Sequence, residues 1–147
     1  MFKKRLLFIL IISSLLSEAH SNGCAIVGAS METYLFNAIL RDLQIDTSTI
    51  LRNRTIVKVI DMSSVSKLYA RSLAKIDYES ALAQGKATIS ENAYFDTYYE
   101  NYTQSLTAKY IYINNEMKKD VFIASSLMNK DECSVRFNSY ITLSREF

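Results

Sequence analysis

Apolar residues recur at spacings of three and four along Ala25–Leu43, which is the pattern of an amphipathic helix. We expect Ser30 to act as an N-cap, because its hydroxyl can accept a backbone N–H of the first turn. Glu32 would then lie at the positive end of the helix dipole. The predicted buried face consists of Met31, Tyr34, Leu35, Ala38, Ile39 and Leu43.

The next apolar segment, Thr55–Met62, is rich in β-branched residues and predicts a strand. Both of its faces are mainly apolar, so we expect a central or well-covered strand. Lys58 and Asp61 are the exceptions. Lys58 either pairs with another charge or extends its ammonium group to water. Asp61 either ends the strand at the sheet edge or is a buried carboxylate with a raised pKa.

Two further helices are expected in the middle of the chain. Ser63, Ser64 and Ser66 offer N-caps for a helix over Val65–Gln84, and Gly85 suits its C-terminal end. Ser90 starts another helix of about four turns. The predicted apolar stripe of the earlier helix is Val65, Leu68, Tyr69, Leu73 and Ile76. That of the later helix is Tyr94, Phe95, Tyr98, Tyr99, Tyr102 and Leu106.

The last third of the chain changes to alternation with a period of two, which predicts strands over Lys109–Ile113, Val121–Met128 and Cys133–Leu143. Turn-forming residues lie between them, at 118–120 and 129–132. The predicted fold is therefore α+β, with about three helices packed on a mostly antiparallel sheet that ends in a C-terminal three-stranded meander. In the last strand we expect Cys133, Val135, Phe137, Ile141 and Leu143 to face the core.

The N-terminal residues have the layout of a secretory signal peptide. A short basic head precedes the apolar run Leu6–Leu16, and the small residues Ala19 and Ser21 stand at the −3 and −1 positions of a cleavage point. The run is too short for a lasting membrane span, which needs about 20 residues. We therefore expect a signal peptide over 1–21 and a single exported domain over 22–147, in the bacterial periplasm or, alternatively, secreted.

The net charge of +2 comes from this leader, which holds three basic residues and one acidic residue. The remaining chain has 14 residues of each sign, interleaved along its length. A nucleic-acid-binding domain would usually concentrate a basic excess on one face. Nucleic acid is therefore not an expected partner.

The two cysteines, Cys24 and Cys133, form an even pair that predicts one disulfide in an oxidising compartment. The alternative is a lipid on Cys24, which would make the protein an outer-membrane lipoprotein. A membrane is an expected partner only in that case.

The sequence after the leader lacks several kinds of catalytic chemistry. His20 is the only histidine in the chain, so a Ser-His-Asp triad, a Cys-His pair and an imidazole zinc site are excluded from the domain. The three glycines do not form a phosphate-binding loop. We expect no catalytic, cofactor-binding or metal-binding residues. A carboxylate-dependent glycan hydrolase remains an alternative, with Glu91, Asp96 and Glu100 as candidates or, instead, as solvated charges.

Tyrosines are dense between positions 94 and 112. One stripe of the helix in this segment must face the core, and we expect that stripe to consist of Phe95, Tyr98 and Tyr102. Tyr94, Tyr99, Tyr110 and Tyr112 are left as candidates for an exposed face that binds protein, peptide or glycan. The sequence thus favours a non-enzymatic exported protein that binds another protein, as an inhibitor, an immunity-type factor or an envelope or secretion assembly accessory.

Overall fold

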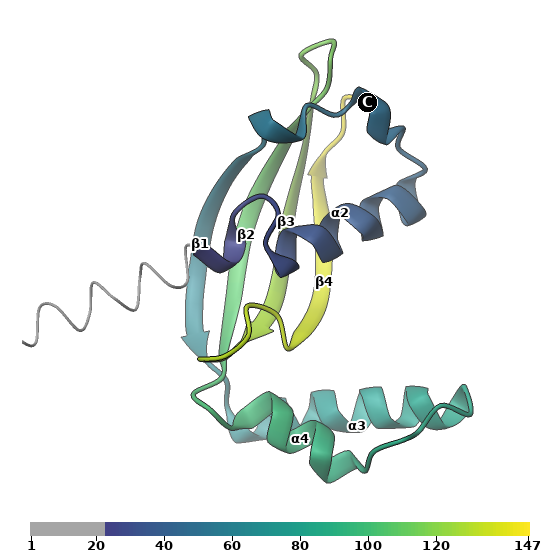
Figure 1. Ribbon diagram of the computed structural model, residues 1–147, viewed down its shortest axis with the longest axis vertical. Coiled ribbons are helices and arrows are strands. Elements are labelled where there is room, and N and C mark those ends of the chain that lie inside the picture. The colour runs from purple at the N-terminus through teal and green to yellow at the C-terminus, as the bar shows by residue number, and fades with distance from the viewer. Residues whose placement is uncertain (1–22) are drawn as a thin grey trace, which may run out of the picture.

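The computed structural model describes residues 23–147, so the expected signal peptide at 1–21 lies outside the described residues. Three α-helices and a four-stranded antiparallel sheet confirm the α+β class (Figure 1). The elements are α2 (Ser30–Leu43), the 3-10 turns η1 (Thr47–Thr49) and η2 (Arg52–Arg54), β1 (Ile56–Ser64), α3 (Lys67–Ala83), α4 (Glu91–Tyr99), β2 (Gln104–Ile113), β3 (Lys119–Met128) and β4 (Arg136–Ser144).

The strands lie in the sheet in sequence order, β1-β2-β3-β4, and every neighbouring pair is antiparallel. Strands β2, β3 and β4 form the predicted C-terminal meander. Between β1 and β2 the chain instead forms a helical hairpin, α3 and α4, which lies beyond one end of the sheet (Figure 1). Strand β1 lies at the edge of the sheet and is exposed along one side, so the expectation of a central or well-covered strand is wrong.

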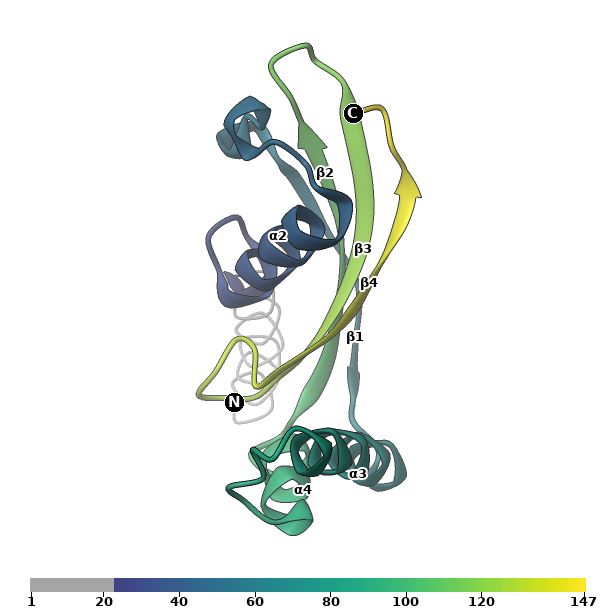
Figure 2. The same ribbon diagram turned by 90° about the vertical axis from the view of Figure 1, so that its right-hand side faces the viewer.

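Helix α2 covers one face of the curved sheet, and Figure 2 shows it on the concave side. We call this the inner face. Side chains from α2 and from the central strands form the main core there, with Tyr110, Tyr112 and Phe122 among its largest fully buried members. The helical hairpin builds a second, smaller core around Leu73, Phe95 and Leu127.

Helix α2 begins later than the periodicity predicted. Gly28 has a φ of +86° and interrupts the predicted helix, so α2 proper begins at Ser30. The N-cap position falls on Ala29, and the expectation that Ser30 caps the helix is wrong. Glu32 is in the first turn as predicted, and its carboxylate accepts the backbone N–H of Gly28 at 2.9 Å.

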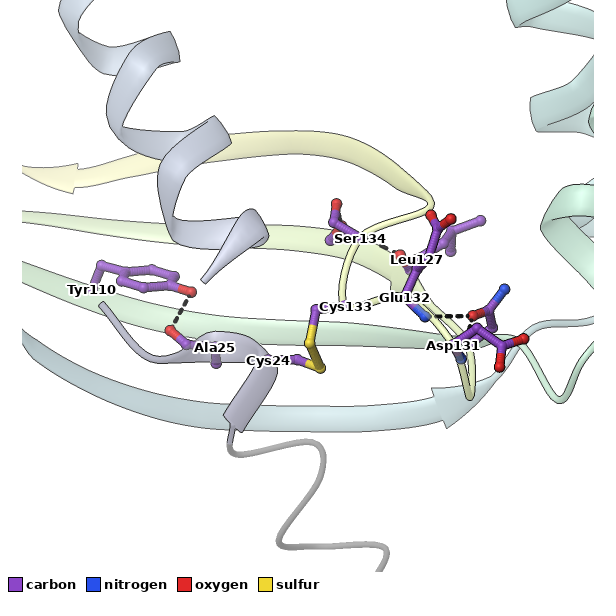
Figure 3. Close-up of a disulfide and its surroundings, with 10 residues drawn as sticks. Cys24, Ala25, Tyr110, Leu127, Asp131, Glu132, Cys133 and Ser134 are labelled. Atoms are coloured by element: carbon purple, nitrogen blue, oxygen red, sulfur yellow. Dashed lines mark hydrogen bonds between the residues drawn. A yellow bond between two sulfur atoms is a disulfide. The ribbon is translucent and has the colours of Figure 1, made fainter. Parts of the chain in front are cut away.

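Cys24 and Cys133 form the predicted disulfide, with their Cα atoms 4.9 Å apart and 109 positions apart in the chain (Figure 3). It ties the segment leading into α2 to the connection between β3 and β4. Nearby, the hydroxyl of Tyr110 donates to the carbonyl of Ala25 at 2.8 Å, which fastens the same segment to the inner face (Figure 3).

The hairpin helices have the predicted N-caps: Ser66 accepts the N–H of Tyr69, and Ser90 that of Ala93. The buried side of α3 differs from the predicted stripe. Ala70, Leu73 and Ala74 are buried, whereas Leu68 is 82% exposed. Small alanine side chains allow α4 to approach α3 closely, which a hydrophobicity stripe does not reveal.

Helix α4 is shorter than the predicted four turns. It ends at Tyr99, and Asn101 and Tyr102 follow with φ values of 55° and 59°, which break the helix. Leu106, which we expected on this helix, is buried on β2 instead.

A β-bulge changes the predicted alternation of the last strand. Ser126 pairs with Phe137 and Ser125 with Ser139, so Asn138 is an extra residue. One extra residue reverses which side chains face the core. Phe137 and Tyr140 therefore both pack on the inner face, and the expectation that Ile141 and Leu143 face the core is wrong.

One segment, Gly23–Leu43, is long and apolar enough to cross a membrane by length and composition alone. In the fold it supplies Met31, Leu35 and Ile39 to the main core, so its apolar character is accounted for by packing.

Candidate functional site

The tyrosines expected on an exposed face are divided between the two cores and the surface. Tyr110 and Tyr112 are fully buried, so the expectation that they are exposed is wrong. Tyr94 and Tyr99 lie on α4, half-buried and exposed respectively. Tyr99 stacks on Phe95 of the same helix, whereas the ring of Tyr94 is tilted against that of Tyr98. The four side chains do not form a common surface.

Tyr112 is instead part of a buried polar cluster. Its hydroxyl donates to Glu32 Oε1 at 2.9 Å, and the guanidinium of Arg52 donates to both oxygens of the same carboxylate. Burial, and then the negative charge of Glu32, raise the pKa of the Tyr112 hydroxyl well above its usual range. Glu32 is fully buried and fully hydrogen-bonded, so the cluster acts as a clamp between α2 and β2.

A second ionic cluster joins the helical hairpin to the sheet. Arg136 donates to both carboxylate oxygens of Asp77, at 2.6 and 2.8 Å, and the hydroxyl of Tyr98 donates to Asp77 at 2.8 Å. Burial opposes ionisation of Asp77, but the hydrogen bonds from Arg136 and Tyr98 outweigh it and hold the pKa of this carboxyl below its usual range. Like the first cluster, this one has a structural role.

The carboxylates considered for glycan hydrolysis lie on or beside α4. Asp96 and Glu100 line a shallow depression of about 270 Å³ together with Glu132, and all three are exposed. Glu91 is half-buried at the start of the helix and does not line this depression. Within residues 23–147 the side chains of Asp96 and Glu100 make no hydrogen bond and no ion pair, and both are solvated.

Residues 23–147 contain no group of three or more His, Cys, Asp or Glu side chains that could hold a metal ion. Asp61 lies exposed on the outer side of β1, so the alternative of a buried carboxylate is wrong. The sulfur of Cys24 is in the disulfide, which accounts for it without a lipid.

A larger depression, of about 380 Å³, lies between α2 and β4. Tyr34 and Phe137 stack there with ring centroids 6.1 Å apart, and Arg41, Asp42 and Tyr140 form a hydrogen-bonded rim. The rim groups satisfy one another, and the depression is open to solvent.

The convex side of the sheet, opposite α2, is a further surface that the contacts above do not explain, and we call it the outer face (Figure 2). No helix within residues 23–147 covers it. Ile56, Ile141 and Leu143 are 52%, 57% and 52% exposed there. The apolar residues between them on β2 and β3, Ile111, Val121 and Ile123, are half-buried. A contiguous apolar surface of sufficient area marks an interaction site.

The strand register shows how the exposed and half-buried residues of the outer face are arranged. One row across the sheet runs from Ile56 to Ile111 and Val121, and ends beside Leu143. The next row runs Lys58, Lys109, Ile123 and Ile141. We call these eight residues the outer patch. The row beyond it is polar, with Asp61, Thr107, Ser125 and Ser139.

Sequence reasoning missed the outer patch although one signal was present. The segment around β1 is apolar on both faces, which we interpreted as a need for cover on both sides. Within residues 23–147 the chain covers the inner face only. Comparisons with known proteins supply no further indication of function: no family model, no curated protein and no solved structure matches this chain.

Proposed function

We propose that this chain is an exported, non-enzymatic protein that binds another protein through the outer patch. The observation that carries the proposal is the aliphatic surface on the outer face, which extends across all four strands and is exposed on β1 and β4 and half-buried on β2 and β3. Burial of apolar surface stabilises a complex by about 25 cal/mol for each Å² removed from water, so covering these side chains would favour association.

The dimensions of the outer face suit a protein partner. Four strands of nine or ten residues give a whole face of roughly 600 Å² from ordinary strand spacing and rise, and the two rows of the outer patch span roughly 250 Å² of it. Standard interfaces bury about 800 Å² on each partner, and weak or transient ones bury less. An inhibitor, an immunity-type factor and an assembly accessory would all use a preformed surface of this size.

Export is part of the proposal, and the disulfide is compatible with it because such bonds persist in oxidising compartments. Intact-mass measurement of the protein from a periplasmic or secreted fraction tests this. We expect the mass of the chain from about residue 22 onward, less two hydrogens. Added acyl mass would contradict the proposal and indicate a lipoprotein.

Site-specific photocrosslinking tests the binding surface. A photoreactive residue at Ile141 or Ile123 should give discrete adducts with another protein in cells that produce the chain. The same residue at Glu79, exposed on the distant α3, is the matched control and should give none. Adducts at Glu79 but not at the outer patch would place the binding surface elsewhere.

A further inference from the structure

The outer patch contains a feature that aliphatic packing does not explain. Lys58 and Lys109 are direct cross-strand partners in the register of β1 and β2, and both lie on the outer face. Opposed residues of an antiparallel pair have their Cβ atoms about 4.5–5.5 Å apart, and like charges there are destabilising. The chain therefore holds two positive charges together at a cost to its own stability.

Neither lysine is neutralised within residues 23–147. Each of the six ion pairs in this part of the chain uses other residues, and neither ammonium group makes a hydrogen bond there. Asp61 is on the same face, one row away, yet it pairs with neither lysine. The two charges are available to a partner.

We infer that the partner presents an amphipathic segment, with aliphatic side chains that cover the isoleucine rows and carboxylates that meet the Lys58–Lys109 pair. This inference rests on the proposed function and adds the chemistry of the segment that would bind the outer patch. Apolar contact supplies the affinity, while the lysine pair selects the sign of charge and the register of the segment.

Charge argues against two other occupants. If two copies of the chain associated through their outer faces, each would contribute the same lysine pair and the exposed Lys119 at the end of β3. Self-association would therefore place like charges near one another. An anionic membrane would be attracted by clusters of four to eight basic residues. The outer face has few basic residues, and the negative charge of Asp61 partly offsets theirs.

Selection from a random peptide library displayed on phage tests the inference directly. The disulfide-bonded protein should select peptides rich in aliphatic residues and in Asp or Glu. The double variant Lys58→Glu, Lys109→Glu keeps a like-charged pair and should select Lys or Arg instead. The same charge preference from both proteins would overturn the inference.

Affinities of the selected peptides make the test quantitative. An acidic peptide should bind the charge-reversed variant at least tenfold more weakly than the original protein. Lys67→Glu, Lys75→Glu is the matched control, because both lysines are exposed on α3, away from the outer patch. If the charge-reversed protein does not fold, Lys58→Gln, Lys109→Gln should still weaken binding several-fold. Unchanged affinity there would overturn the inference.

Two further measurements separate the inference from the proposed function. Peptides that still bind Ile123→Ser, Ile141→Ser would show that the isoleucine rows are not the docking site. Concentration-dependent dimers in light scattering, or binding to vesicles of anionic phospholipid, would identify one of the rejected occupants. Crosslinked adducts at Ile141, together with peptide selections that show no charge preference, would support the outer patch as the binding surface. They would contradict only the inference that the bound segment is acidic.

Discussion

The two faces of the sheet are built from the same four strands, yet they differ in composition and exposure. The inner face carries aromatic side chains, and Tyr110, Tyr112 and Phe122 are fully buried beneath α2. The outer face carries aliphatic residues and a lysine pair in contact with water. Apolar character is common to both, so the difference lies in what the chain provides to cover each face.

The polar groups on the two faces also differ. On the inner face the buried carboxylates of the described residues are paired, Glu32 with Arg52 and Asp120 with Arg145. On the outer face two charges of the same sign oppose one another. The charges of the inner face are thus neutralised within the described part of the chain, whereas the lysine pair of the outer face is not.

The largest expected effect comes from detaching the segment that covers the inner face. Replacing both Cys24 and Cys133 by serine removes a crosslink between residues 109 positions apart in the chain. Because this crosslink restricts the unfolded chain, its loss should lower the free energy of unfolding by about 4 kcal/mol. Denaturant unfolding followed by circular dichroism measures this. Reduction of the unmodified protein should lower its stability by a similar amount, and an unchanged midpoint would contradict a stabilising role for the bond.

Truncation of one aliphatic side chain on each face compares the two directly. Leu35→Ala should cost about 3 kcal/mol, because Leu35 is fully buried and leaves a cavity. Ile141→Ala, on the exposed outer face, should cost less than about 1 kcal/mol in the isolated protein. Equal losses in urea unfolding would mean that the outer face is covered in solution.

Removal of the buried charge on α2 tests the electrostatic side of the comparison. Glu32→Gln keeps the shape of the side chain but leaves Arg52 without its ionic partner, and should cost about 1–2 kcal/mol. The control is Glu116→Gln, because Glu116 forms an exposed ion pair with Lys118. Thermal unfolding should be nearly unchanged for that variant.

The smallest effect concerns the attachment of the helical hairpin and depends on pH. The pKa of Asp77 is lowered in the folded protein, so the folded state binds a proton less readily than the unfolded chain. Its contribution to stability is therefore present at neutral pH and is lost as the pH falls below the ordinary range for Asp, about 4. Asp77→Asn should melt at a lower temperature at pH 7, and its melting temperature should fall less steeply between pH 4 and pH 2. Parallel curves for the two proteins would contradict this role.

The sequence predicted the order of the elements well, because caps and strand patterns are local. Ser66 and Ser90 cap their helices as expected, and the cysteine pair indicated which distant segments meet. The side-chain orientation on β4 was not predictable, because the bulge at Asn138 shifts the alternation and has no signature in hydrophobicity. Periodicity also does not indicate which of the two apolar faces of the sheet α2 covers. The exposure of the outer patch could therefore be seen only in the structure.

The placement of the helical hairpin between β1 and β2 also has a consequence for the order of folding. Strands β2, β3 and β4 are joined by short connections, whereas β1 must pair across the whole hairpin, and closing the longer loop costs more entropy. We expect the meander to form first and β1 to add late, so Val57→Ala should speed unfolding in stopped-flow measurements and leave the folding rate unchanged. Lys58 comes from β1 and Lys109 from β2. We therefore expect the lysine pair to be completed only in the last step of folding, so a chain that is still folding would lack the two opposed charges.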